Sequence, residues 1–262
     1  MKIFQHITIL MVLVLVFSGC ESQQKKNQQE IIRLPDLMPK GGPQYTGKMI
    51  AGLSIIFFEV DADKFSNIQV LLKGGSQLQT GIDYSENELS FGNGDVSNWP
   101  EIESRLTDAN VTIAKRVTLF MNEGINEQVE VVAFPQGTSV NYKTGNEAAA
   151  AMGLPAGNLV FDFSVKSLIG LKQVCQLNIN PIYKTLRKKV DDKKLPAWQY
   201  DFESVNLNSQ IRPGQFVYIA PEIQSDKEKI QTLPSLGKIF FTNSQKENRI
   251  KFCIIVCGLI KD

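Results

Sequence analysis

The sequence predicts an α+β fold in which a small module of strand, helix, strand, strand, helix and strand (residues 49–115) precedes a β-rich region (residues 116–262). Three observations lead to this prediction. Apolar residues recur at helical spacing in two segments, and both lie before residue 110. Beyond residue 116 short runs rich in β-branched and aromatic residues follow one another instead. Glycines and prolines separate these runs, as turns separate short strands.

The module begins with an apolar run at residues 49–58 that is typical of a buried strand. Residues 61–73 are predicted as a helix, because apolar residues recur there every three or four positions up to a glycine pair that can cap it. Short strands are expected near 76–80 and 88–91, followed by a turn at Gly92-Asn93-Gly94. Asn98 and Pro100 mark the start of a second helix, and a strand near 111–113 completes the module.

The β-rich region is predicted to contain a series of short strands with little helix. The runs with strand character are residues 117–121, 128–134, 139–142, 158–165, 173–179, 203–207, 215–219 and 250–256. A single helical turn is predicted at 147–152, where four alanines precede Met152. The mixed charges of residues 187–194 are expected to form a solvated loop.

Residues 1–19 are predicted to be a signal segment. Lys2 is the only charged residue before Cys20, and the apolar run at 7–17 is shorter than the roughly 20 residues that a transmembrane helix needs. Phe17-Ser18-Gly19-Cys20 resembles the lipobox of bacterial lipoproteins. This resemblance implies cleavage between Gly19 and Cys20, and lipidation of the Cys20 thiol.

Residues 20–48 are predicted to be the lipidated cysteine and a flexible tether. Residues 21–30 are polar throughout and cannot form a core, and prolines and glycines are frequent over residues 35–43. The residue after Cys20 is Glu21. The lipoprotein resemblance then implies a lipid-anchored protein of the outer membrane that faces the periplasm.

Composition excludes several functional classes. Lysine and arginine number 28 against 27 aspartates and glutamates, so the chain has no electrostatic basis for binding nucleic acid. His6, within the signal segment, is the only histidine, which excludes a Ser-His-Asp or Cys-His catalytic arrangement and a histidine-ligated metal in the mature chain. No P-loop or dinucleotide-binding glycine pattern occurs. We therefore expect no enzyme, no cofactor and no metal site.

Three cysteines follow Cys20 in the sequence. Cys253 and Cys257 lie four positions apart in a predicted strand, which separates them by about 13 Å and prevents a bond between them. We expect all three, Cys175 included, to be small buried side chains. A disulfide from Cys175 to Cys253 or to Cys257 remains the alternative in an oxidising compartment.

The last fifty residues carry a motif. Gly214-Gln215 enters an apolar strand, Pro234-Ser235-Leu236-Gly237 begins a predicted loop, and a final apolar strand follows. This order resembles the C-terminal part of bacterial secretins, the ring-forming outer-membrane channels. The resemblance implies fold-related roles for six residues: Gly214, Gln215, Pro234, Leu236, Gly237 and Phe240. The Leu-Gly element occurs once here and twice in the family, which favours a shortened, non-channel relative.

We therefore predict an envelope lipoprotein with a structural or protein-interaction role, possessing a lipid anchor and partnered by other envelope proteins or by itself. One alternative is a ring-forming, secretin-like channel component. Another is a ligand-binding lipoprotein that uses Trp99 or Trp198 as a platform, although packing is the expected role of both rings.

Overall fold

The computed structural model describes residues 33–39, 49–73, 84–145, 149–168, 171, 173–185, 189–190, 193–194, 198–222, 233–242 and 248–261. The predicted cleavage and lipidation site at Gly19-Cys20 and the strand predicted near 76–80 lie outside these residues. Ile31–Asp262 forms one compact unit. None of the helices in the described ranges is long and apolar enough to cross a membrane.

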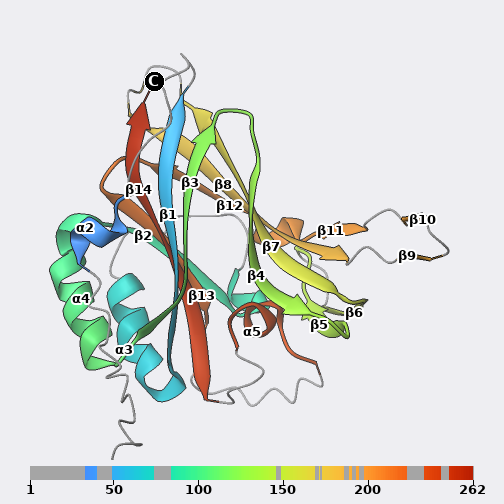
Figure 1. Ribbon diagram of the computed structural model, residues 1–262. Helices are drawn as coiled ribbons and strands as arrows, with labels where there is room; N and C mark the ends of the chain where they lie inside the picture. The colour runs from blue at the N-terminus through green and yellow to red at the C-terminus, as the bar shows by residue number, and fades with distance from the viewer. Residues whose placement is uncertain are drawn as a thin grey trace, which may run out of the picture. The chain divides into compact units, whose positions relative to one another are not determined.

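One antiparallel sheet, sheet A, crosses the middle of this unit (Figure 1). Its strand order is β2 (Leu89–Asp95), β13 (Gln215–Pro221), β14 (Arg249–Lys261), β1 (Ile50–Asp61) and β3 (Thr112–Asn122). β1 is buried over almost its whole length, because it pairs with β14 and β3 on its two edges and is covered on both faces. The continuous apolar run of β1 reflects this two-sided burial.

The second sheet, sheet B, packs on one face of sheet A. Its strand order is β11 (Gln199–Asp201), β8 (Cys175–Thr185), β7 (Gly157–Ser167) and β4 (Glu127–Phe134), with β12 (Leu207–Ile211) also pairing with β8. Two hairpins complete the strands: β5 (Thr138–Tyr142) with β6 (Ala150–Leu154), and β9 (Lys189–Val190) with β10 (Lys193–Lys194).

Helices cover the other face of sheet A. These are α2 (Leu34–Leu37), α3 (Ala62–Lys73) and α4 (Trp99–Asp108), the last preceded by the 3₁₀ turn η2 (Val96–Asn98). Two apolar cores result: one lies between the sheets, and one lies between sheet A and the helices. A short helix α5 (Leu236–Phe241) and the 3₁₀ turns η1 (Tyr84–Asn87) and η3 (Glu203–Val205) border the first core.

The predicted α+β class with a β-rich second part is confirmed. The division expected between residues 115 and 116 falls inside β3, and β13 and β14 return from the C-terminal region to pair with β2 and β1. The chain therefore does not divide into two domains at residues 115 and 116. The physical reason is the pairing of β1 with β14, because without it each of these strands would have an unpaired edge.

Several local predictions are corrected by packing. Gly92-Asn93-Gly94 lies within β2 and is not a turn, because the rings of Tyr218 and Phe216 on β13 pack over the two glycines. A Cβ atom at Gly92 would lie 2.7 Å from the Tyr218 ring. Residues 150–152 of the predicted helical turn belong to strand β6, and the strand predicted at 203–207 starts as η3.

The predicted tether is also corrected, because residues 33–39 are docked on the folded unit. We call these residues the strap. Leu37 is fully buried in the core beneath the helices, and Pro39 lies over Gly52 of β1 and Gly258 of β14. An apolar side chain with a close-fitting proline contributes burial energy that a polar tether lacks, which is why composition alone missed the contact.

Gly258→Ala is expected to release the strap while the sheets remain folded. A Cβ atom at residue 258 would overlap the Pro39 ring, lying 2.7 Å from its Cγ. Trypsin should then cleave after Arg33 at least several-fold faster than in the wild type, and Leu37→Ser should give the same result by removing the apolar anchor. Mass spectrometry measures the rate of cleavage after Arg33. A rate unchanged from the wild type in both variants would contradict the docking of the strap.

Candidate interaction surface

The Gly214-Gln215 pair of the predicted motif forms the turn between β12 and β13. Gly214 has a φ of +84°, a conformation that favours glycine. Its N–H donates to the carbonyl oxygen of Cys257 at 2.9 Å, and its own carbonyl accepts from Val96 N–H at 2.8 Å. The Gln215 side chain accepts from Arg212 N–H at 3.3 Å. These contacts join the turn to its neighbours in both directions along sheet A.

The loop predicted at Pro234-Ser235-Leu236-Gly237 is in fact the start of helix α5. Ser235 caps it by accepting from Lys238 N–H at 3.3 Å, and Pro234 supplies its carbonyl to Asn141 N–H at 2.8 Å. Gly237 lies against the backbone of Glu88, where a Cβ atom would overlap the carbonyl oxygen and lie 2.6 Å from the carbonyl carbon. The glycine therefore serves close approach of two backbones instead of a sharp turn.

Helix α5 closes one end of the core between the sheets. Leu236 and Phe240 are buried, and the Phe240 ring stacks on Phe161 of β7 with a centroid distance of 5.2 Å and an interplanar angle of 13°. The Glu88 carboxylate accepts from Ser235 Oγ at 2.5 Å and lies 3.4 Å from Lys238 Nζ. Five of the six motif residues thus lie in packing or turn positions, whereas Pro234 is exposed and contributes its carbonyl oxygen to the contact with Asn141.

The two tryptophans occupy different environments. Trp99 at the start of α4 is fully buried, so it cannot act as a binding platform. Trp198 is 46% exposed and its ring lies 5.9 Å from that of Tyr200. Only Trp198 remains accessible to a ligand.

A small cavity lies between the sheets. It is lined almost entirely by apolar side chains, Phe161, Ile179 and Phe240 among them. Its volume of about 10 Å³ is close to that of a single water molecule. Across the described ranges no group of three or more His, Cys, Asp or Glu residues is placed to hold a metal ion.

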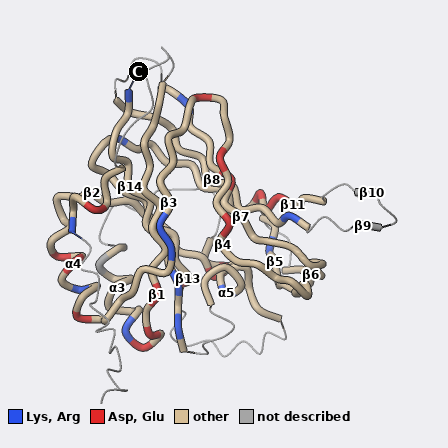
Figure 2. The backbone as a smooth tube through the Cα atoms, viewed as in Figure 1, with Lys and Arg blue, Asp and Glu red and all other residues tan. Residues whose placement is uncertain are grey.

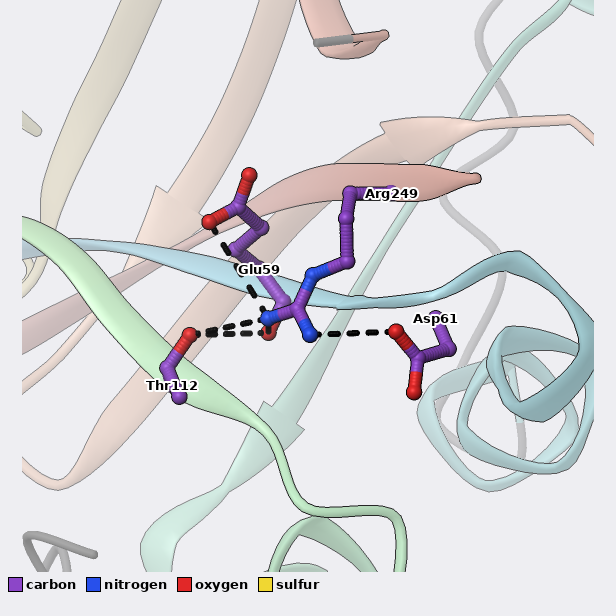
Figure 3. Close-up of polar contacts among 4 residues, drawn as sticks. All are labelled: Glu59, Asp61, Thr112 and Arg249. Carbon is purple, nitrogen blue, oxygen red and sulfur yellow. Dashed lines mark hydrogen bonds and ion pairs between the residues drawn. The ribbon is translucent and has the colours of Figure 1, made fainter. Parts of the chain in front are cut away.

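Arg249, at the start of β14, ties together the ends of three adjacent strands (Figure 3). Its Nη1 donates to Asp61 Oδ1 at 3.0 Å, and its Nη2 donates to the Glu59 carbonyl oxygen at 3.2 Å and to Thr112 Oγ1 at 3.1 Å. The Glu59 carboxylate lies 4.0 Å from Nη2. Because every contact joins β14 to β1 or β3, this cluster fixes strand register and is not a candidate for substrate chemistry.

The outward face of sheet B is the candidate interaction surface. Its inward side chains, such as Phe161 and Phe163, belong to the core, so the intervening residues point away from sheet A. Apart from Val160 and Ile182, which are opposite each other, most of these outward positions carry polar side chains on four adjacent strands. We call the uncharged polar side chains, together with Asp162, the amide face. Its residues are Gln128 on β4, Asn158, Asp162 and Ser164 on β7, Gln176, Asn178 and Asn180 on β8, and Asn208 and Gln210 on β12.

Strand register aligns the amide face in rows. Asn208 is opposite Asn178, and Asn178 is opposite Ser164. Gln210 is likewise opposite Gln176. Directly opposed side chains in antiparallel strands have Cβ atoms roughly 5 Å apart, so each row presents hydrogen-bonding groups at regular intervals.

Part of this face is held in place by internal hydrogen bonds. The Asp162 carboxylate, only 8% exposed, accepts from Asn126 Nδ2 at 2.6 Å and from Gln128 Nε2 at 2.8 Å. Asn178 Nδ2 donates to Ser164 Oγ at 3.3 Å. Figure 2 shows charged residues on the edge strands β3 and β4. Charge also lies within the outward face, because Asp162 belongs to it and Lys166 and Lys184 are opposite Gln176 and Asn158. The surface therefore offers mainly hydrogen-bonding amides beside charged groups of both signs.

No protein-family model matches the sequence, and no curated protein matches it. Among solved structures, the chain is similar to the type IV competence pilus secretin PilQ of V. cholerae, with 13% identity, a TM-score of 0.23, and coverage of 81% of this chain and 59% of that chain. It is also similar to the secretin-domain β-barrel of InvG from the Salmonella SPI-1 injectisome, with 10% identity, a TM-score of 0.22, and coverage of 82% and 61%.

The chain spans about three fifths of the length of these two solved chains. Both likenesses are weak, and at these TM-scores they carry no argument.

The sequence contained a signal for the amide face. The alternation of Leu177, Ile179 and Pro181 with Gln176, Asn178 and Asn180 is visible in the printed sequence and predicts one buried and one polar face. What the alternation cannot show is that β7, β8 and β12 lie side by side, which places their polar residues on a single surface.

Proposed function

We propose that this chain is a lipid-anchored, non-catalytic interaction protein of the bacterial cell envelope, and that it binds an envelope protein or a second copy of itself through the amide face. The observation that carries the proposal is the row-by-row alignment of amide side chains on the outward face of sheet B. The lipid anchor is supported by the lipobox-like Phe17-Ser18-Gly19-Cys20.

The chemistry of the face favours a protein partner. Asparagine and glutamine side chains each donate and accept hydrogen bonds, so they can pair with backbone and side-chain groups of another protein. Burying such groups is tolerated only when their hydrogen bonds are replaced, which makes the surface selective for a complementary partner. Neutral amides also give little attraction to anionic lipid or nucleic acid.

Site-specific photocrosslinking in intact cells tests the face. A benzophenone side chain at Gln210 is expected to give a discrete crosslinked adduct, and the same group at Asn67, exposed on α3 on the far side of sheet A, is expected to give none. Adding Asn178→Glu and Asn208→Glu should abolish the adduct, because it places two like charges directly opposite each other on the face. An adduct of equal yield at Asn67, or one indifferent to the glutamates, would refute the assignment of the face.

Membrane fractionation tests the anchor separately. Wild-type protein is expected in the membrane fraction with incorporated labelled fatty acid, whereas Cys20→Ser should lose the label and the membrane association. The mass of the crosslinked species in mild detergent then distinguishes the partners. A mass of two copies of this chain indicates a dimer, and a mass of about a dozen copies indicates a ring. A mass of one copy plus a chain of different mass indicates another envelope protein. Wild-type protein that carries no lipid would overturn the anchored part of the proposal.

A further inference from the structure

Two of the three buried cysteines lie on either side of one turn. Cys175 is the first residue of β8 and is paired with Ile211 of β12 in sheet B. Cys257 lies on β14 in sheet A, and its carbonyl oxygen accepts from Gly214 N–H at 2.9 Å. Ile211 and Gly214 are the two ends of the turn that passes from sheet B to sheet A. Each cysteine is therefore adjacent to one end of the same short connection.

The side chains of both cysteines point into the space between the sheets. Cys175 and Cys257 are fully buried members of the same apolar core. Burial, and to a smaller degree the neighbouring Cys175, raise the pKa of the Cys257 thiol to about 12. The effect of one sulfur on the other agrees with the closeness that the strand pairing gives them.

We propose that Cys175 and Cys257 form a disulfide that joins sheet A to sheet B when the chain folds in an oxidising compartment. The oxidant is a small or protein disulfide. The thiolate of one cysteine attacks it, forming a mixed disulfide and releasing one thiolate. The thiolate of the other cysteine then attacks the mixed disulfide, which forms the Cys175–Cys257 bond and releases the second thiolate. The two thiol protons end on the two released thiolates. The two cysteines are thus oxidised by two electrons, and the disulfide oxidant is reduced by the same two electrons to two thiols.

Cys253 is the cysteine left as a thiol. It lies four residues before Cys257 on β14, which places it about 13 Å further along the strand and away from the β12–β13 turn. It is paired with Ile219 in the middle of β13, not with a residue at the turn. Burial raises the pKa of its thiol, which makes it unreactive in the folded protein.

The bond must form during folding. Cys175 and Cys257 are fully covered in the native structure, so an exchange partner cannot reach either sulfur once the sheets have closed. The expected behaviour is that native, reduced protein resists oxidation, whereas protein refolded from denaturant with glutathione disulfide acquires the bond.

Refolding of the purified full chain in a glutathione redox buffer tests this without assuming export. After denaturing alkylation, peptide mapping is expected to find Cys175 linked to Cys257 and Cys253 alkylated. The oxidised protein should melt about 10 °C above the reduced protein, because the bond closes a long loop. Cys253→Ala is the matched control and should keep both the link and the shift.

Two results would overturn the proposal. The first is alkylation of all three cysteines after refolding in the oxidising buffer, and the second is a link that includes Cys253. Peptide mapping of the wild type gives this answer even if Cys175→Ala or Cys257→Ala fails to fold. Protein isolated from cells then reports only on the compartment: a bond formed in vitro and missing in vivo would leave the pairing intact and count against export.

Discussion

Gly237→Ala is expected to destabilise the protein by roughly 3 kcal/mol, within the usual range for overpacking a closed contact. The new Cβ atom would overlap the Glu88 carbonyl oxygen and lie 3.1 Å from the carbonyl oxygen of Asn87. Alanine is the better helix former by about 1 kcal/mol, so a purely local view predicts the opposite sign. The clash should win because both partners are backbone atoms and cannot rotate away.

Neither side of this contact can move cheaply. The Glu88 carbonyl accepts from Glu222 N–H at 2.8 Å, and Glu88 itself has a φ of +54°. On the other side, Leu236 and Phe240 hold α5 in the core. A shift of either element would therefore break a hydrogen bond or open a cavity.

Urea unfolding measures the effect, with Gly153→Ala as the control. Gly153 lies on β6 and is exposed, and no atom of the described residues outside its immediate chain neighbours comes within 4 Å of the position that an added Cβ would take. Its replacement should therefore change stability by less than about 0.5 kcal/mol. Equal stability of the two variants would show that α5 does not sit on the Glu88 backbone.

Trp99→Ala should produce a loss of about 3–5 kcal/mol, the usual cost of emptying a buried tryptophan site. Trp99 is fully buried in the core between sheet A and the helices, and it anchors the first turn of α4. Since total stability of a domain is usually about 5–15 kcal/mol, this loss should lower the urea midpoint strongly.

Trp198→Ala provides the comparison, because its side chain is 46% exposed. Its backbone bonds to Thr185 do not depend on the ring, so a change within about 1 kcal/mol is expected. Fluorescence adds a second readout: the protein that keeps only Trp99 should emit at shorter wavelength than the one that keeps only Trp198. The reverse order of emission or of stability would contradict the burial of Trp99.

Local sequence patterns were sufficient wherever local interactions decide the structure. The spacing of Phe65, Ile68 and Leu72 predicted α3, and their burial against sheet A is what the spacing requires. The short runs with strand character predicted β4, β5, β7 and β13 to within a few residues. The α+β class followed from the helical spacing and these runs together.

Predictions were wrong where distant residues set the conformation. Gly92 and Gly94 suggested a turn, but rings from β13 fill the space above them and keep β2 extended. Pro234 and Gly237 suggested a loop, but Glu88, far away in the sequence, presents a backbone on which a glycine-containing helix can rest. No local propensity encodes either partner.

The sequence by itself determined the helical spacing and the strand-like runs, the lack of any histidine after His6, the near-zero net charge and the lipobox-like segment at Cys20. Only the tertiary structure decided that β14 returns to pair with β1 and that Pro39 docks over two glycines. It also decided that Cys257, and not Cys253, lies with Cys175 at the turn between β12 and β13. The physical reason is that the spacing of apolar residues in a helix or strand depends only on neighbouring residues. Which strands and surfaces pack together depends instead on burial summed over the whole chain.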